Sequence, residues 1–481
     1  MQHIRLTCIA AIAICLGGCT SLPDFVNHGF KVGPEYTTAK AEVATQWIDS
    51  ADSRIGGHAA NLSRWWSAFN DPALNELIEH AYRQNVNLKE YGTRILQARA
   101  QLAITKGELF PQNQNVTGGY TREAGPSFPL SNNWNMGFNL AWELDFWGSY
   151  RRQVQSANAQ LEGSVEDYDA VLVTLLADTA QYYITMRQAE ERIALAKENA
   201  KLQRETLQVV QTRFNGGAVH ALDVFQQQST LAATEAAIPA LEIVLRQSQD
   251  QLCTLQGIPP SDLRGRLEER PIPAAPAEAA LGIPAELLQR RPDVRAAERA
   301  AAAQAEQIGI AQADFYPHLS INGTLGYSAS TASHLFSPGN FTGLAGPAFT
   351  WNILNYGRVA SNVSLQDARF QQALLDYRTA VLTANQEAED ALAAFLRSQE
   401  QERKFADGVI AAKKAYQIVI SQYQAGTVDY TRLAQVQANL LLLEDAEAQA
   451  RAAIATGLVQ VYRALGGGWE IRLAAGNNSP T

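Results

Sequence analysis

The sequence predicts a mainly α-helical chain with a transmembrane β part, built as a tandem duplication of one helix–strand–strand–helix unit. Three features predict this class: motifs that recur about 206 to 209 residues apart, two very long helices without proline, and four segments of about ten residues with alternating polarity. The formal net charge of −9, from 39 basic and 48 acidic residues, gives no electrostatic support for binding nucleic acid, which requires a clustered basic surface.

The first 18 residues have the features of a secretory signal. Arg5 precedes an apolar run from Leu6 to Leu16, which is too short to span a bilayer comfortably. The segment LGGC at 16–19 resembles a bacterial lipobox. That resemblance implies cleavage before Cys19, a diacylglycerol thioether on this residue and an N-acyl chain such as palmitate. The alternative is an ordinary signal peptide with a chance cysteine.

The residue after the predicted anchor is Thr20. An Asp at this position would resemble an inner-membrane retention signal, so Thr20 implies delivery to the outer membrane. Two or three acyl chains hold a protein to a bilayer much better than one. Once the signal is removed and Cys19 is acylated, Cys253 is the remaining thiol. No intramolecular disulfide is then possible, and the apolar surroundings of Cys253 predict a buried packing role.

Internal repeats organise the rest of the chain. Four pairs of segments match: LFPQNQNVTGGY (109–120) with FYPHLSINGTLGY (315–327), WELDFWG (142–148) with WNILNYG (351–357), the DY pairs beginning at 167 and 376, and RFNGGAV (213–219) with QYQAGTV (422–428). The offset is nearly constant, so the copies differ by few insertions. The predicted parts are a signal (1–18), an acylated N-terminal segment (19–72), a first repeat (73–257), a linker (258–283), a second repeat (284–468) and a C-terminal tail (469–481).

Each repeat is expected to contain three helices around its two strands. Asp71 is the predicted N-cap of the first helix, with Pro72 at its first helical position. The predicted ranges are about 73–109 and 284–315 for the first helices, about 151–214 and 358–423 for the long helices, and nearly forty residues ending at Gly257 and near Gly466 for the return helices.

Apolar residues in the long helices repeat every 3.5 residues. From Leu161 to Met186 the spacing is 4, 3, 4, 3, 4, 3, 4, and the second copy repeats it from Phe370 to Phe395. This period predicts helices packed side by side with supercoiling, each about 95 Å long at roughly 1.5 Å per residue. Two shorter helices are expected to stack end to end beside each long one, giving four helical columns. A plain coiled-coil rod is the alternative that these helices alone support.

The four strands are expected to cross a membrane. In FNLAWELDFWG (138–148), apolar residues alternate with polar or small ones, which indicates one apolar and one polar face. Each segment is near the length of a membrane-crossing strand, and aromatic residues cluster near the ends, as at membrane interfaces. The predicted strands are about 113–122, 134–146, 318–328 and 344–355.

Four strands cannot close a barrel, because the smallest membrane barrels have eight. An open sheet in lipid would leave unpaired backbone groups at both edges, each costing several kcal/mol. Pairing with further copies of the chain removes this cost: two copies give eight strands and three give twelve. The apolar face would then contact lipid and the polar face a lumen. The alternative is a water-soluble sheet packed on its own helices.

Long motifs in the chain resemble the TolC-like outer membrane factors, specifically the NodT-like lipoprotein branch that serves RND-type efflux pumps. RWWSAFNDPALNELIEHAYRQNVNL (64–88) resembles the start of that family's first repeat, and IPAELLQRRPDVRAAERA (283–300) resembles the start of its second. The turns RFNGGAVHALDV and QYQAGTVDYTRL resemble its helix-hairpin tips. The resemblance covers nearly everything after Cys19.

The resemblance implies a homotrimer whose twelve strands form one outer-membrane β-barrel, continued by a long periplasmic α-helical barrel with an equatorial region around it that includes the linker 258–283. It implies a passive exit duct, anchored in the outer membrane through Cys19, that conducts drugs or other small molecules. The partners implied are a periplasmic adaptor and an inner-membrane RND-type pump. No catalytic residue, metal or cofactor is expected beyond the lipid on Cys19.

The hairpin tips carry the predicted docking surface. Gly217 and Gly426 occupy matching positions, where a tight reversal between helices favours glycine at positive φ. The family's adaptors grip these hairpins, which implies docking roles for seven residues, whereas the alternative is that they only make a turn. The seven are Arg213, Gly217, Ala218, Val219, Gly426, Thr427 and Val428.

The resemblance also implies a constriction near the tips, often lined by carboxylates. This sequence departs from that pattern, because Arg432 and Gln435 stand where many relatives place Asp. The nearby acids are Asp429 and Asp223. A ring of like charges would set ion selectivity and bias gating, so Asp223, Asp429, Arg432 and Gln435 are the candidate aperture residues. A solvated hairpin charge is the alternative for each.

Other functions have weaker support in the sequence. The histidines show no ligand-like spacing, and Gly466-Gly467-Gly468 lacks the Lys-Ser/Thr of a phosphate loop, so an enzyme is not expected. The remaining alternatives are a duct for type I protein secretion and a structural coiled-coil lipoprotein without a channel. The lipobox and the 283–300 motif favour efflux.

Overall fold

The structure, a computed structural model, describes residues 22–476 except 39, 42, 57–61, 127, 264–266 and 281–288. The predicted signal peptide, Cys19, residues 283–288 of the second-repeat motif and residues 477–481 lie outside this part of the chain. The described residues divide into two compact units, one with those within 1–41, 93–166 and 295–379 and the other with those within 42–92, 167–294 and 380–481.

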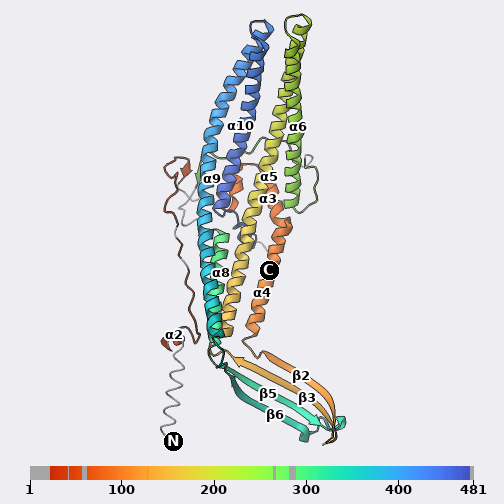
Figure 1. Cartoon of the computed structure of the whole chain (residues 1–481), viewed down its shortest axis with the longest axis vertical. Coiled ribbons are helices and arrows are strands. Elements are labelled where there is room, and N and C mark those ends of the chain that lie inside the picture. Colours follow the sequence, from red (N-terminus) through yellow and green to blue (C-terminus); the bar gives the residue numbers. More distant parts are fainter. Residues whose placement is uncertain are drawn as a thin grey trace. The chain divides into compact units, whose positions relative to one another are not determined.

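The order of elements repeats, as the duplicated motifs predict (Figure 1). Both long helices have 67 residues and both return helices have 35. The first repeat contains α3 (Pro72–Gln84), α4 (Val86–Gly107), β2 (Asn113–Gly125), β3 (Phe128–Leu144), α5 (Ser149–Asn215) and α6 (Ala221–Leu255). The second contains α8 (Pro292–Ala313), β5 (His318–Ala329), β6 (Phe341–Thr350), α9 (Arg358–Gln424) and α10 (Tyr430–Ala464).

Among the described helices, none has both the length and the apolar character to cross a membrane.

Short elements precede, connect and follow the parts of the two repeats. The short elements are α2 (Leu22–Asn27), the 3₁₀ helices η1 (Leu62–Phe69), η2 (Ala332–His334) and η3 (Pro338–Asn340), α11 (Ile471–Gly476), and a parallel pair of two-residue strands, β1 (Ile55–Gly56) and β4 (Ala279–Ala280).

The predicted continuous helix at 73–109 is wrong, because Asn85 divides it. Its backbone N–H still donates to Ala81 O, but its ψ of 127° leaves the helical region. The Asn85 side chain then accepts from Leu88 N–H at 2.8 Å and donates to Leu255 O at 2.9 Å. Asn85 therefore ends α3 and caps the start of α4. The predicted N-cap of α3 is confirmed: Asp71 Oδ1 accepts from Ala73 N–H at 2.9 Å.

The first unit contains a four-stranded antiparallel sheet in the order β2-β3-β5-β6. Phe138 of β3 pairs with Val116 of β2 and with Leu325 of β5, so apolar residues of neighbouring strands share one face. Asn139 lies on the other face, where its side chain donates to Asn115 and Thr117, each at 3.0 Å. The predicted division into an apolar and a polar face is therefore present.

Two strand boundaries differ from the prediction by five residues or more. β3 begins at Phe128, six residues before the predicted start at 134, because β2 continues to Gly125 and the two form a long hairpin. β6 ends at Thr350, five residues before the predicted end at 355. Thr350 is the last residue of β6 that pairs with β5, since its partner His318 begins that strand.

The N-terminal part of the first unit is held on α5 by two consecutive arginines. Arg151 donates to Gly29 O at 2.6 Å and to Phe30 O at 2.9 Å. Arg152, which is fully buried, donates to Val32 O and forms an ion pair with Glu306 at 2.6 Å. The chain that follows the predicted lipid anchor is thus fixed to the helix that continues from β3.

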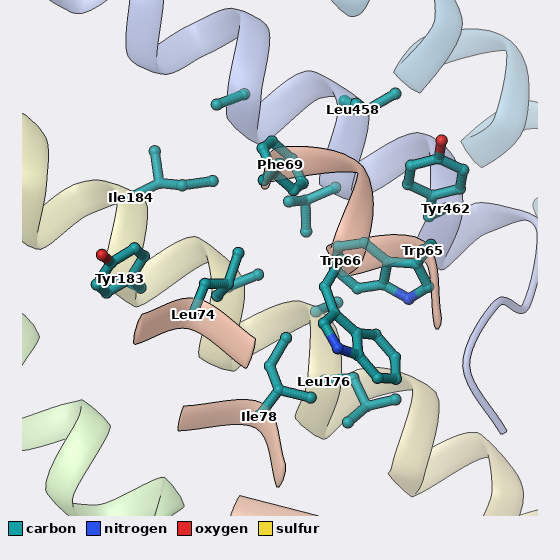
Figure 2. Packing of buried hydrophobic residues seen from close by; sticks show 14 of the residues in the cluster. Trp65, Trp66, Phe69, Leu74, Ile78, Leu176, Tyr183, Ile184, Leu458 and Tyr462 are labelled. Carbon is teal, nitrogen blue, oxygen red and sulfur yellow. The ribbon is translucent and has the colours of Figure 1, made fainter. Parts of the chain in front are cut away.

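The second unit has an aromatic core (Figure 2). Trp65 of η1 stacks on Tyr462 of α10, with ring centroids 5.4 Å apart. Tyr183 of α5 donates its buried hydroxyl to Asp71 Oδ2 at 2.7 Å, and burial raises the pKa of Tyr183 to about 12. The motif at 64–88 therefore supplies both the N-cap and several residues of the core of this unit. Cys253 is buried in the same cluster, as predicted.

The described part of the C-terminal tail predicted for 469–481 contains a turn and the short helix α11 (Ile471–Gly476). Gly466 and Gly468 have φ of +69° and +104°, and a Cβ on Gly468 would lie 2.5 Å from Leu176 Cδ1, so this glycine permits a close turn. α11 follows, and its Arg472 forms two hydrogen bonds of 2.7 Å with the buried carboxylate of Asp169. Residues 474–476 of the predicted tail belong to α11.

Candidate functional site

The two hairpin tips of the second unit share one local structure. Ala218 N–H donates to Arg213 O at 2.8 Å and Gly217 N–H to Phe214 O at 2.9 Å. The second tip repeats both bonds, from Thr427 to Gln422 O and from Gly426 to Tyr423 O, each at 3.0 Å. Gly217 and Gly426 have φ of +72° and +80°. These are Schellman motifs, in which a left-handed glycine satisfies the last helix carbonyls, so the predicted reason for the glycines is confirmed.

Carboxylates begin both return helices. Asp429 is the N-cap of α10 and accepts from Arg432 N–H at 2.9 Å. Asp223, in the first turn of α6, accepts from His220 N–H at 3.4 Å. A carboxylate at a helix N-terminus satisfies free N–H groups and interacts favourably with the helix dipole. The two acids therefore have a structural role at the tips, while a role at the aperture stays a prediction, as it does for the exposed Arg432 and Gln435.

A small apolar cluster joins the two hairpins just behind their tips. Tyr430 lies in it and donates its hydroxyl to Gln227 Oε1 of α6 at 2.9 Å. Gln227 in turn donates to Gln203 O of α5 at 3.1 Å. Burial raises the pKa of Tyr430 to about 12. The buried members of this tip cluster are Val210, Val224, Val419, Tyr423, Tyr430 and Leu433.

Arg213 is a packing residue as well as a candidate docking residue. Its guanidinium carbon lies 4.6 Å from the ring centroid of Tyr423, and its Nη1 donates to the carbonyl oxygen of Tyr423. The contact combines a cation–π interaction with a charged hydrogen bond. Burial raises the pKa of Tyr423, and the Arg213 charge opposes that rise. One side chain of the first hairpin thus fixes the end of α9 in the second.

The predicted docking residues divide by exposure. Gly217, Ala218, Gly426 and Thr427 are exposed, whereas Arg213, Val219 and Val428 are half-buried. Two large apolar side chains on the first turns of α6 were not among the predicted residues: Leu222 is 70% exposed and Phe225 is 67% exposed. They continue the exposed surface of the first tip. Large apolar residues in the sequence after a hairpin glycine were the signal that could have identified them.

The sheet of the first unit presents a second candidate surface. Its apolar face is exposed along all four strands, with exposed fractions of 64% at Val116, 52% at Leu325 and 70% at Phe349. Aromatic pairs lie at one end of the sheet, including Tyr120 and Trp134, whose ring centroids are 4.6 Å apart. An exposed apolar patch of this extent is typical of contact with lipid or another protein.

The polar face of the same sheet carries few charges. In the four strands as described, Glu123, Glu143 and His318 are its ionisable side chains, and it has no lysine or arginine. His318 Nδ1 lies 2.6 Å from Glu143 Oε1, and Tyr150 donates to Glu143 Oε2 at 3.3 Å. Among the described residues, no three His, Cys, Asp or Glu side chains are arranged to hold a metal ion.

The outer edges of the sheet have no partner within the described chain. β2 pairs only with β3, and β6 pairs only with β5. Each edge strand therefore presents a row of free N–H and C=O groups beside an apolar face. Such an edge is stable in lipid only when another strand pairs with it.

Comparisons with known proteins agree along the whole chain. The sequence profile of the family described as "Outer membrane efflux protein" matches residues 77–257 and 283–467. The pyoverdine export outer membrane protein OpmQ of Pseudomonas aeruginosa is 30% identical over 489 aligned residues, covering 98% of this chain and 98% of OpmQ. The toluene efflux pump outer membrane protein TtgC of Pseudomonas putida is 28% identical over 477, covering 96% of each. The solved structure of the outer-membrane channel OprN has a TM-score of 0.86 and 32% identity, covering 91% of this chain and 99% of OprN.

Proposed function

The chain belongs to the outer membrane efflux protein family, and we propose that it is the outer-membrane exit duct of a tripartite efflux system. Membership confirms the resemblance seen in the sequence motifs, and the fold is that of the TolC-like channels. In the proposed role the protein does no chemistry. It passively conducts drugs or other small molecules from a periplasmic adaptor and an inner-membrane pump to the exterior.

The observation that carries this proposal is the open four-stranded sheet, which has one apolar face and two edges that no strand of the described residues pairs with. Three copies joined edge to edge give a closed twelve-stranded barrel, in which the apolar face contacts lipid and the Asn- and Thr-rich face lines the lumen. A coiled-coil lipoprotein without a channel would have no use for such a sheet. The assembly proposed is therefore a homotrimer.

The hairpin tips are the proposed docking end for the adaptor. Both tips end in backbone turns fixed by glycine at positive φ, and the tip cluster with the Arg213–Tyr423 contact holds them together. Leu222 and Phe225 add exposed apolar surface at the first tip. A rigid end with exposed apolar anchors suits binding to a partner, because little order is lost on association.

Acylation of Cys19 is the proposed anchor to the outer membrane. The distance from Cys19 to the first clamped residue, Gly29, is ten residues of sequence. Arg151 and Arg152 hold the following segment on α5 at the point where β3 leads into the helix. An acyl chain on Cys19 would thus keep the base of the sheet close to the membrane surface.

Small-molecule export is favoured over protein secretion by the names of the relatives, which refer to pyoverdine export and toluene efflux. Deleting the gene in its native host and measuring intracellular accumulation of a fluorescent efflux dye, with and without the plasmid-borne gene, tests the proposal. We expect higher accumulation in the deletion strain and full reversal by the wild-type gene. Unchanged accumulation of every dye and drug, together with loss of an exported protein from the medium, would support secretion instead.

A further inference from the structure

The two repeats build the junction between sheet and helix in the same way. In the first repeat, Trp142 donates its indole N–H to Leu109 O at 3.3 Å. In the second, the matching Trp351 donates to Phe315 O at 3.0 Å. Leu109 and Phe315 also match each other in the duplicated motifs. Contacts seen at one junction are therefore a guide to the other.

A further contact joins the two repeats beside β3 and β5, the two central strands of the sheet. Trp147, at the end of the first motif, stacks on Tyr316 with ring centroids 4.4 Å apart. Its indole N–H donates to Pro317 O at 2.9 Å. Tyr316 and Pro317 lead into β5, the neighbour of β3. The aromatic residue after one strand thus packs on the Tyr-Pro pair before the next strand, and both aromatics are half-buried.

The equivalent residues at the outer edges make no such contact within the described part of the chain. Tyr356 matches Trp147 in the second repeat and is 92% exposed. Phe110 and Pro111 match Tyr316 and Pro317, and Phe110 is 68% exposed. Tyr356 also has a φ of +50°, which is costly for a residue with a side chain unless its surroundings hold it. Two complementary halves of one contact therefore lie open, one after β6 and one before β2.

We propose that Tyr356 of one copy packs on Phe110 and Pro111 of a second copy of this chain, as β6 pairs with β2 across the subunit boundary. The occupant is a second copy because the halves match a contact already present inside the chain and lie at opposite edges of one sheet. Such a head-to-tail contact repeats from copy to copy until the ring closes. This inference rests on the proposed trimeric duct and adds to it the residues and register of the subunit boundary.

The register follows from the internal pairing. Leu140 of β3 pairs with Gln114, and Phe349, its equivalent 209 residues later, pairs with Leu319. Gln114 thus corresponds to Leu319, an offset of 205 residues. The internal pair Ala141 and Asn322 then maps onto Thr350 of one copy and Thr117 of the next. Both threonines belong to the polar face, as their partners in the sheet do.

A cysteine cross-link tests this register in the full-length protein. Thr117→Cys combined with Thr350→Cys places thiols opposite each other on antiparallel strands, within reach of a disulfide. Oxidation in isolated outer membranes should give covalent dimers and trimers on a non-reducing gel, and neither single variant should do so. Val116→Cys combined with Thr350→Cys is the matched control, because position 116 faces the other side of the sheet. A ladder from the control pair and none from the test pair would overturn the register.

Alanine variants test the aromatic contact itself. Tyr356→Ala and Phe110→Ala should each lower the temperature at which the trimer dissociates on a gel. The double variant should dissociate at the same temperature as the less stable single variant, because both substitutions remove the same contact. Phe336→Ala, in an exposed aromatic of the β5–β6 loop, should leave that temperature unchanged. Additive effects of Tyr356→Ala and Phe110→Ala would contradict the contact.

The native mass separates this inference from the proposed function. A mass of three chains without the Thr117–Thr350 cross-link would overturn the subunit boundary and leave the duct proposal standing. A monomer without the cross-link would overturn both.

Discussion

Replacing Gly217 tests whether the exact shape of the first hairpin tip is needed for export. Gly217 has a φ of +72°, and no atom lies within 4 Å of where its Cβ would stand. Gly217→Ala therefore adds only backbone strain, about 1 to 2 kcal/mol. Gly217→Pro fixes φ near about −65° and removes the N–H that donates to Phe214 O at 2.9 Å. The turn must then rebuild, at a cost of roughly 3 kcal/mol or more for the native geometry.

The disruption should stay local, because the tip cluster behind the turn still joins the two hairpins. We expect Gly217→Pro to reach the outer membrane in normal amounts and to lower the minimum inhibitory concentrations of exported drugs to those of the deletion strain. Gly217→Ala should stay close to the wild type and serves as the matched control. Wild-type resistance in a Gly217→Pro strain with normal protein levels would refute a docking role for this tip.

Three further predictions concern the core and the anchor. Asp71→Ala should lower the free energy of unfolding by about 3 kcal/mol, since it removes an N-cap and leaves the buried Tyr183 hydroxyl without its acceptor. Thermal unfolding followed by circular dichroism measures this loss. Tyr183→Phe should lower the free energy of unfolding by only about 1 kcal/mol. Burial raises the pKa values of Tyr183 and Tyr430 to about 12, so the folded state favours the neutral phenols. Their contribution to the free energy of unfolding is therefore present below pH 10 and is lost as the pH rises toward 12. In Tyr183→Phe and Tyr430→Phe, the free energy of unfolding should fall less steeply between pH 10 and pH 12. The same dependence on pH as in the wild type would contradict a role for these phenols. Cys19→Ala should abolish labelling by radioactive palmitate, and undiminished label would exclude the predicted anchor.

The duplicated architecture could be predicted because its signals are periodic and local. The heptad spacing from Leu161 to Met186 predicted α5, and the matching spacing predicted α9. Alternating polarity around Phe138 predicted β3 and its two faces. Glycine at the tips and Asp71 before α3 acted as predicted, because caps depend on a few neighbouring residues.

The features that escaped prediction depend on partners far away in the sequence. Asn85 breaks a helix-compatible stretch because its side chain reaches Leu255 O, 170 residues later. A charged residue beside a hairpin turn, such as Arg213, is expected to be exposed. Its guanidinium instead lies over the ring of Tyr423, 210 residues away in the sequence, because the two hairpins pack together. β6 ends at Thr350 because its partner β5 begins at His318, and no local signal in β6 marks that point.

The candidate aperture residues have one property that neighbouring residues determine and another that depends on other copies of the chain. The N-cap role of Asp429 is readable from its position before a helix. Which side chains line a constriction depends on the packing of several copies around one axis, which the sequence of one chain does not encode locally. Asp223, Asp429, Arg432 and Gln435 therefore remain predictions for the aperture.

The native mass of the detergent-extracted protein, corrected for bound detergent, shows whether several copies of the chain share one barrel. A closed barrel built from four-stranded sheets whose edges pair between copies requires a discrete oligomer, and we expect a mass of three chains. A monomeric mass from isolated outer membranes would leave the edges of β2 and β6 unpaired, and would contradict the duct.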